Sequence, residues 1–463
     1  MMNRNLFYIV RQILVIGWLL GPVAGFAAPA KNLIWIIADG TGPETMGFFM
    51  QGARAGALAD YPQKTTALEQ LFQVGEQGLF FHYTHGSVVT DSAAAATQMA
   101  TGAWTLPDRV GVDFEGKTVP NLLELARQQG KAIGIISDAY VTDATPAGFT
   151  AHVLSRKQKM EIAREQLALA PEVILGGGKK YFSTGENKEL LKQARKQGYQ
   201  LPNDKKSLKK IHSGKVLGLF ADTNLPMAVE MYQHPAVPSL AEMTAQALKI
   251  LAQNPDGFVV MVEAGKVDWA AHANDAGATL SEMKVLDKTI EVALRFAQEH
   301  PDTLIYVNSD HDTGMGGFTY QVLTPQGVVR KTEQGEVLYE GNTFYATFDT
   351  YAKLEKQRRC LYYVEKELTK LPAEKLTPDY VEKVLRKALG YPVDISNFNN
   401  LHDVPGIFRQ LNDLYAIAWA TQTHSSAPLI GVAYGPGQEL FKGVYHNTDI
   451  LPKLKKILGW SEQ

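Results

Sequence analysis

The feature that most restricts the fold of this chain is a set of short apolar runs separated by segments with helix signals. The runs lie at residues 33–37, 132–136, 258–262, 304–307 and 428–433. A strand that is apolar at every position, rather than at alternate ones, is typical of a parallel sheet covered on both faces. The sequence therefore predicts an α/β fold, a three-layer α/β/α sandwich with a mostly parallel central sheet.

Helix start signals stand between these runs. Ser239 and Glu242 have capping-box spacing ahead of a helix expected to extend to about residue 253. Thr279 and Glu282 have the same spacing ahead of a helix expected to extend to about residue 300. The alternation of helix and strand supports the layered α/β prediction.

Acidic residues follow several of the predicted strands. Asp39, Glu263 and Asp310 stand at or just past strand ends, and Asp91 follows a short β-branched run. Ligands of open parallel sheets bind beyond the carboxyl ends of the strands, so we expect these four carboxylates to converge on one rim. Gathered carboxylates require a counter-charge, and the sequence therefore predicts cations at this rim.

Ser92 begins an alanine-rich stretch that Gly102 ends. A hydroxyl at a helix N-terminus meets free N–H groups and the positive end of the dipole, which favour an alkoxide or a phosphate. Taken alone, however, Ser92 is more typical of a simple N-cap, because serine is a preferred cap. Whether Ser92 is a helix cap or a catalytic nucleophile depends on the other residues that lie near it.

Aspartate and histidine, two residue types that bind metal ions, occur close together at several places in the sequence. Asp268 and His272 lie four residues apart, one helical turn, so both can face one cation, with Glu263 before them. Asp310 and His311 form a second pair after a strand. His424 precedes the last core strand. Aspartate with histidine suits zinc and glutamate suits a harder ion such as magnesium, although each histidine alone could be structural.

Composition narrows the class of partner. The 463 residues include 46 basic and 48 acidic side chains, a formal charge of −2, which gives no electrostatic argument for nucleic acid or a membrane surface. We therefore expect a small-molecule partner. Cys360 is the single cysteine, so an intramolecular disulfide is impossible.

Residues 1–30 resemble a secretory signal peptide. Arg4 and Arg11 precede the apolar stretch 13–20, and small residues follow it up to Ala30. The sequence thus predicts a periplasmic or secreted protein without a stable membrane span after cleavage. An uncleaved anchor is the alternative, although the stretch is short for a span.

Residues 31–463 are expected to form one catalytic domain with an insertion at about 319–413. The insertion is mixed in charge and aromatic, with helix-like segments at 351–370 and 379–389. We expect it to form either a cap over the site or an arm across a partner subunit.

Together, these motifs make the chain resemble the alkaline phosphatases. The resemblance rests on motifs in the family's order: Ala38-Asp39-Gly40, Thr90-Asp91-Ser92-Ala93, Asp143-Ala144-Thr145-Pro146-Ala147, Ser155-Arg156, Glu263 to His272, Asp310-His311, Thr423-His424 and Ala433-Tyr434-Gly435-Pro436. Each motif is weak alone, but the ordered set is specific.

The resemblance implies two zinc ions and one magnesium ion. Their implied ligands are Asp268, His272 and His424 for one zinc, Asp39, Asp310, His311 and the Ser92 oxygen for the other, and Asp39, Thr145 and Glu263 for magnesium. Three divalent ions bring six positive charges against the four carboxylates among these ligands, Asp39, Asp268, Asp310 and Glu263, and the remaining two positive charges match the dianion of a phosphate monoester.

The implied activity is hydrolysis of phosphate monoesters through a phosphoserine on Ser92. Arg156 would bind two non-bridging phosphate oxygens with its planar fork, and Asp91, which has no metal to bind, would orient Arg156. The family usually forms homodimers, so a homodimer is expected.

Two positions depart from the family. Asp143 stands where many members carry histidine, and Trp269 stands where many carry lysine or histidine. That second position contacts phosphate through water in such proteins, so both are candidate substrate contacts and an altered phosphate affinity is expected.

Three alternatives remain open. A related sulfatase would need a Pro and Arg pattern after the modified residue, whereas four alanines follow Ser92. A phosphodiesterase would have less use for Arg156 and a third metal. A non-catalytic exported metal- or phosphate-binding module would not need an intact Ser92.

Overall fold

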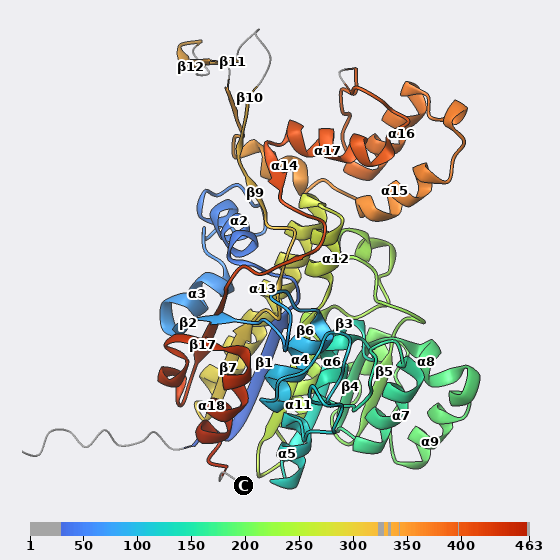
Figure 1. The fold of residues 1–463 in the computed structure, drawn as a ribbon, viewed down its shortest axis with the longest axis vertical. Helices are drawn as coiled ribbons and strands as arrows, with labels where there is room; N and C mark the ends of the chain where they lie inside the picture. Colours follow the sequence, from blue (N-terminus) through green and yellow to red (C-terminus); the bar gives the residue numbers. More distant parts are fainter. Residues whose placement is uncertain (1–28, 323–327, 332–334, 342, 397, 461–463) are drawn as a thin grey trace, which may run out of the picture.

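Within the part of the chain that the structure describes, nine strands form one sheet through the centre of the protein (Figure 1). The computed structural model describes residues 29–322, 328–331, 335–341, 343–396 and 398–460. In spatial order the strands are β17 (Gly443–His446), β2 (Glu76–Phe81), β16 (Leu429–Tyr434), β7 (Thr303–Asn308), β1 (Asn32–Ala38), β6 (Phe258–Ala264), β3 (Ala132–Tyr140), β4 (Val173–Gly177) and β5 (Val216–Leu219).

The pairing confirms a mostly parallel sheet. Every adjacent pair from β7 to β5 is parallel, and β16 is antiparallel to both of its neighbours. The five apolar runs all form strands of this sheet. Parallel neighbours place the carboxyl ends of β7, β1, β6 and β3 at one rim, which is where the predicted acids follow.

Helices cover both faces, as the uninterrupted apolar pattern predicted (Figure 1). In β1, Ile34 and Ile36 pack into one apolar cluster, and Leu33, Trp35 and Ile37 pack into another. The first cluster includes residues of α2 (Pro43–Arg54), α3 (Ala67–Val74), α11 (Leu240–Leu251) and α13 (Ala276–Glu299). The second includes residues of α4 (Ser92–Thr101), α5 (Leu122–Gln128), α7 (Lys159–Leu169), α8 (Lys179–Ser183), α9 (Leu190–Lys196) and α18 (Ile450–Ile457).

Shorter elements complete the domain. They are α6 (Ala144–Gly148), α10 (Lys205–Leu208), α12 (Lys266–His272) and the 3-10 helices η1 (Gly185–Asn187), η2 (Ala228–Gln233), η3 (Ala373–Lys375), η4 (Gln438–Phe441) and η5 (Asn447–Asp449). Helix α12 follows β6 directly, so its first turn lies at the rim of the sheet.

One predicted capping box is confirmed and one is wrong. Ser239 accepts a hydrogen bond from the backbone N–H of Glu242 at the start of α11. Helix α13 starts earlier than predicted, at Ala276, because Asp275 accepts from the N–H of Ala278. Glu282 lies inside that helix, buried, where its carboxylate accepts a 2.6 Å bond from the N–H of Ala228.

The simple interpretation of Ser92 as an N-cap is also wrong. Asp91 is the cap of α4, because its Oδ1 accepts from the N–H of Ala94 at 3.0 Å. Ser92 is the first residue of the helix, and its side chain is left for other partners. The residues just before Asp91 form no strand, so this carboxylate reaches the rim through a loop and not from a strand end.

The segment predicted as an insertion forms two parts. Short strands flank the segment, with β8 (Asp312–Thr313) and β9 (Gly316–Phe318) before it and β14 (Ile417–Trp419) and β15 (His424–Ser425) after it. Within the segment lie β10 (Tyr320–Val322), β11 (Val328–Lys331), β12 (Val337–Gly341) and β13 (Thr343–Tyr345), and β11 and β12 lie farthest from the central sheet in Figure 1. Its helices are α14 (Asp349–Leu354), α15 (Leu361–Thr369), α16 (Pro378–Leu389) and α17 (Val404–Leu414), which lie together above α12 in Figure 1.

The single helix expected at 351–370 is two helices, α14 and α15. The chain turns between them because Asp275 of the sheet domain holds the turn. Its carboxylate accepts hydrogen bonds from Gln357 Nε2 at 2.8 Å and from the backbone N–H of Leu361 at 2.6 Å. A contact 86 residues away in sequence cannot be seen in a local helix pattern.

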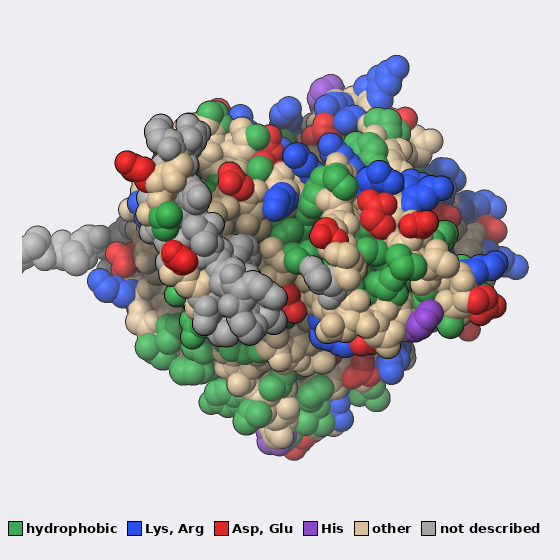
Figure 2. Space-filling model, turned by 90° about the horizontal axis from the view of Figure 1, so that it is seen from above, with side chains coloured by type: hydrophobic (Ala, Val, Ile, Leu, Met, Phe, Trp, Pro, Cys, Tyr) green, Lys and Arg blue, Asp and Glu red, His purple; other side chains and the backbone are tan. Residues whose placement is uncertain are grey.

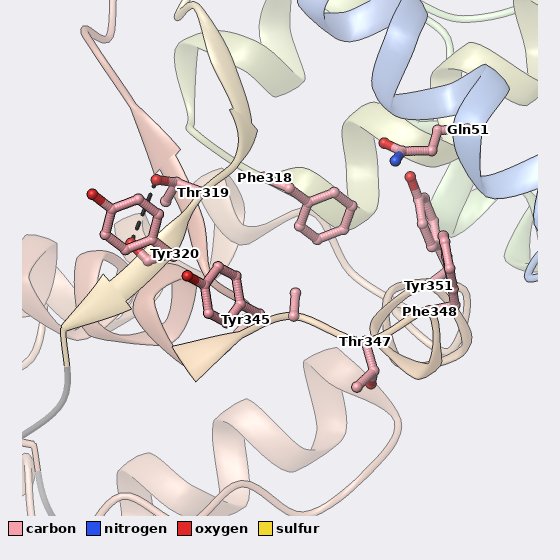
Figure 3. A pocket seen from close by; sticks show the side chains of 9 residues that line it. Gln51, Phe318, Thr319, Tyr320, Tyr345, Thr347, Phe348 and Tyr351 are labelled. Carbon is pink, nitrogen blue, oxygen red and sulfur yellow. Dashed lines mark hydrogen bonds between the residues drawn. The ribbon is translucent and has the colours of Figure 1, made fainter. Parts of the chain in front are cut away.

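An aromatic pocket lies where this segment meets α2. Its volume is about 330 Å³, and Phe318, Tyr320, Tyr345 and Tyr351 contribute to its wall (Figure 3). The Tyr351 hydroxyl donates to the carbonyl of Phe48 at 2.6 Å, which fixes α14 against α2. The pocket lining contains no acid or histidine, so it offers none of the predicted metal chemistry.

Seen from above, cationic and anionic side chains are interspersed, with hydrophobic ones between them (Figure 2). This face therefore carries no extended field of one sign, in keeping with the balanced composition. No helix within the described residues is long and apolar enough to cross a bilayer. The expected signal peptide, apart from its last two residues, lies outside the described residues.

Candidate active site

Three predicted ligands form a first group at the rim. His272 Nε2 lies 3.2 Å from His424 Nε2 and 3.4 Å from Asp268 Oδ1. His424 Nε2 lies 3.8 Å from the same Asp268 oxygen. Asp268 and His272 come from α12, one turn apart, and His424 comes from β15. Three donors that point at one another in this way surround a position for a cation.

Backbone carbonyls orient both imidazoles of this group. His272 Nδ1 lies 2.6 Å from the carbonyl of Gln422, and His424 Nδ1 lies 2.9 Å from the carbonyl of Thr90. A carbonyl can only accept, so Nδ1 carries the proton in each neutral ring and Nε2 keeps a lone pair for a metal. The loop that leads to Ser92 thus also fixes a ligand.

Asp39, Asp310 and His311 form a second group, fully or almost fully buried. His311 Nε2 lies 3.4 Å from Asp39 Oδ1 and 3.3 Å from Asp310 Oδ2. The ring of His311 stacks on that of His424, with centroids 3.6 Å apart. Proximity alone would therefore also group His311 with Asp268 and His424. We assign His272 to that group because its Nε2 contacts both His424 Nε2 and Asp268 Oδ1, whereas His311 Nε2 contacts both carboxylates of the second group.

Thr145 and Glu263 extend the second group. The Thr145 hydroxyl lies 3.4 Å from Asp39 Oδ2 and also interacts with the Glu263 carboxylate. Ser137 of β3 donates a short hydrogen bond to Glu263 Oε2. Glu263 is the next-to-last residue of β6, so its side chain lies close to the rim of the sheet.

The electrostatics of the site fit cations. Burial and the neighbouring carboxylates of Asp310, Asp268 and Glu263 raise the pKa of Asp39 well above its usual value. Burial and then the charge of Asp143 raise the pKa of Glu263 in the same way. Within the described part of the chain, Asp39 Oδ1 and Asp310 Oδ2 are buried without a hydrogen-bond partner. Unpaired buried carboxylate oxygens are costly, and divalent cations would satisfy them.

Ser92 lies beside the second group. Its Oγ is 3.0 Å from His311 Nε2, and its side chain is buried at the first turn of α4. Burial and the neighbouring His424 lower the pKa of His311 well below its usual value, so this ring is neutral. The Ser92 hydroxyl therefore lies beside the place toward which Asp39, Asp310 and His311 direct their donor atoms.

Arg156 lies between two carboxylates. Its Nη1 donates to Asp91 Oδ2 at 3.2 Å, and its Nη2 lies 3.4 Å from Asp143 Oδ1. Asp91 therefore caps α4 with one oxygen and holds Arg156 with the other. Trp269, the next residue after Asp268, is half-buried beside Tyr140, with ring centroids 6.3 Å apart.

Comparisons with known proteins show the family to which the chain belongs. The sequence model of the alkaline phosphatase family matches residues 30–460. The chain belongs to this family. It is 32% identical over 439 residues to "Alkaline phosphatase 4" of Bacillus subtilis, covering 93% of this chain and 89% of that protein. It is 33% identical over 367 residues to the Escherichia coli alkaline phosphatase, covering 66% and 77%.

Solved structures show the same fold. The alkaline phosphatase of Thermus thermophilus has a TM-score of 0.79 at 26% identity and covers 96% of each chain. The cold-active enzyme of a Shewanella species has a TM-score of 0.74 at 26% identity, covering 92% of this chain and 99% of that one. The α/β sandwich is thus confirmed, and the chain is a metal-dependent phosphomonoesterase of the alkaline phosphatase family.

Three residues of this candidate site had no role in the predictions made from the sequence. Thr313 bonds Asp268, Ser137 bonds Glu263, and Lys159 lies 3.1 Å from Asp143. Thr313 and Lys159 stand two and three residues after the motif residues His311 and Arg156, and this closeness in sequence could have indicated that they lie near the site. Ser137 follows the apolar run 132–136 inside β3 and has no other sequence signal, and its pairing across β3 and β6 brings it to Glu263.

Proposed function

We propose that this enzyme hydrolyses phosphate monoesters to an alcohol and inorganic phosphate through a covalent phosphoserine on Ser92. The observation that carries the proposal is the position of the Ser92 hydroxyl, 3.0 Å from His311 Nε2 at the junction of two groups of ligand atoms. A helix N-terminus below it adds N–H groups and a favourable dipole for an anion.

The residues fit two zinc ions and one magnesium ion. Asp268, His272 and His424 would hold one zinc, because all three direct a donor atom to one place. Asp39, Asp310 and His311 would hold the other. Asp39, Thr145 and Glu263, an all-oxygen set, would hold magnesium. When bound, such ions stabilise the attacking and leaving oxygens of an in-line displacement and lower the pKa of a neighbouring hydroxyl.

The chain's own residues then account for both half-reactions. Ser92 Oγ attacks phosphorus as the bond from phosphorus to the ester oxygen breaks, and the proton that Ser92 loses is balanced by the proton that the departing alkoxide gains to leave as the alcohol. Water next attacks the phosphoserine, the Oγ–P bond breaks, and inorganic phosphate departs as Ser92 regains a proton. Arg156 binds two non-bridging oxygens throughout, and Asp91 keeps its guanidinium in position.

The test is trapping of the intermediate. Purified enzyme with zinc and magnesium is mixed with an aryl phosphate, quenched in acid and digested, and phosphate on the Ser92 peptide is measured by mass spectrometry. We expect phosphorylated Ser92 in the wild type. We expect Ser92→Ala to keep its fold and nearly all its metal, to show no phosphopeptide and to lose most turnover. Wild-type turnover by the alanine variant would exclude the nucleophile.

We also propose export and dimerisation. Residues 1–30 would direct the chain to the periplasm or the medium, and N-terminal sequencing of the mature protein tests this. Light scattering of the purified enzyme tests the homodimer. For the insertion we favour the cap, since Asn412 of α17 donates to the carbonyl of Asn274 at 3.0 Å, two residues after His272.

A further inference from the structure

Asp143 has more partners than a simple helix cap needs. It is buried, with 6% of the residue exposed, and its Oδ1 accepts from the N–H of Ala144 at the start of α6. The same oxygen lies 3.1 Å from Lys159 Nζ and 3.4 Å from Arg156 Nη2. Two cations from different segments therefore share one buried carboxylate.

Lys159 is held in place and is not an ordinary surface lysine. Its side chain is only 14% exposed, and its ammonium lies 4.8 Å from the centre of the Tyr140 ring. It is also the first residue of α7, where the helix dipole disfavours a cation. A buried ammonium at an unfavourable helix end requires compensation, and Asp143 with the Tyr140 face supplies it.

Four side chains in contact with one another balance in charge. Asp91 and Asp143 carry two negative charges, and Arg156 and Lys159 carry two positive ones. The Arg156 contact with Asp143 is the longer of its two carboxylate contacts, at 3.4 Å against 3.2 Å for Asp91. If the Arg156 fork turns toward a phosphate, it must give up part of this pairing. Asp143 would then remain as a buried charge, which is unfavourable unless another cation stays beside it.

We infer that Lys159 is a positioning residue that keeps Asp143 neutralised, so that Arg156 is available to bind phosphate. This inference rests on the proposed role of Arg156 in phosphate binding. Without Lys159, Arg156 would be the one cation among the described residues still paired with Asp143, and Asp143 would compete with phosphate for it. Lys159 thereby sets how tightly the site holds substrate and product.

The test is a double-mutant cycle on Lys159 and Asp143 in the metal-loaded enzyme. Lys159→Met removes the charge and keeps the length, Asp143→Asn removes the competing charge and keeps an acceptor, and Lys159→Arg restores a cation. The measurements are kcat, KM for an aryl phosphate and the inhibition constant of inorganic phosphate. Thermal melting checks folding, and Lys159→Gln replaces the methionine variant if that variant does not fold.

In the protein that keeps Asp143, we expect Lys159→Met to raise KM and the phosphate inhibition constant together, by about tenfold, without a fall in kcat. We expect Lys159→Arg to restore both constants. In the Asp143→Asn background, Lys159→Met should change neither constant, because no carboxylate is left to compete for Arg156.

Two results would overturn the inference. Equal effects of Lys159→Met in both backgrounds would mean that its ammonium acts on phosphate directly. Unchanged constants in the Asp143 background would mean that Lys159 serves only the fold. Failure of the proposed function is distinguishable from both, since it would appear as an absence of the Ser92 phosphopeptide in the wild type.

Discussion

The Thr313 hydroxyl donates a 2.6 Å hydrogen bond to Asp268 Oδ1. Thr313 Oγ1 also lies 3.2 Å from His311 Nδ1, so the buried Thr313 side chain joins a predicted ligand of the first group to a predicted ligand of the second. Because the hydroxyl proton is given to Asp268, His311 donates through Nδ1, which leaves its Nε2 lone pair facing Asp39, Asp310 and Ser92.

Thr313→Val keeps the shape of this side chain and removes both hydrogen bonds. We expect metal affinity to fall by roughly 10- to 100-fold, because Asp268 and His311 lose the partner that orients them. The measurement is metal loss against a chromophoric chelator at fixed pH. Thr313→Ser, which keeps the hydroxyl, should behave like the wild type. Equal affinities of the valine and serine variants would show that the hydroxyl does not matter.

Asp91 has two tasks that substitutions can separate. Asp91→Asn keeps an oxygen for the N–H groups of Ala94 and Asp108 and removes the charge that holds Arg156. We expect melting to change little and the phosphate inhibition constant to rise about three- to tenfold, since Arg156 is less well positioned. Asp91→Ala should show the same rise and also lose about 1 kcal/mol of helix capping. An unchanged inhibition constant in both variants would remove Asp91 from phosphate binding.

Trp269 offers no cation to phosphate. We expect Trp269→Lys to lower the phosphate inhibition constant about tenfold, because an ammonium beside Asp268 can donate a charge-assisted hydrogen bond. Trp269→Gln is the matched control, since it also removes the ring but adds no charge. If the lysine and glutamine variants give the same constant, the loss of the indole explains the change and the charge does not.

The sequence predicted the sheet and its rim well because both are encoded locally. Strands buried on two faces must be apolar throughout, and a parallel sheet brings their following loops together. Asp39 and Asp310 therefore reached the site from strand ends that were visible in the sequence. Asp268 and His272 were predicted correctly to lie on one helix face, because four residues make one turn.

Contacts between distant segments could not be predicted in this way. Asp275 rather than Thr279 starts α13, since its carboxylate also holds the turn before α15. The pairing of Lys159 with Asp143 depends on how α7 packs beside α6. The direction of β16 is likewise invisible in its apolar pattern, which is the same for either orientation.

Asp287 gives a prediction about stability that is independent of the metal site. It is a buried residue of α13 whose Oδ1 accepts a 2.7 Å hydrogen bond from the N–H of Leu68 in the first turn of α3. Burial raises the pKa of Asp287 from 3.8 to about 6. A folded-state pKa above the unfolded value means that the native state binds this proton more tightly, so the stabilisation is complete below about pH 4 and disappears as pH rises through 6.

Asp287→Asn should therefore remove this pH dependence, because the neutral amide oxygen still accepts from Leu68 without a buried charge. We expect the variant to exceed the wild type in unfolding free energy by about 2–3 kcal/mol at pH 8 and to match it near pH 4. Urea unfolding of the metal-loaded enzyme across this range measures the difference. Asp287→Ala should be less stable than the asparagine variant at every pH, because it leaves the Leu68 N–H unpaired. Parallel pH curves for the wild type and Asp287→Asn would exclude ionisation of Asp287 as the cause.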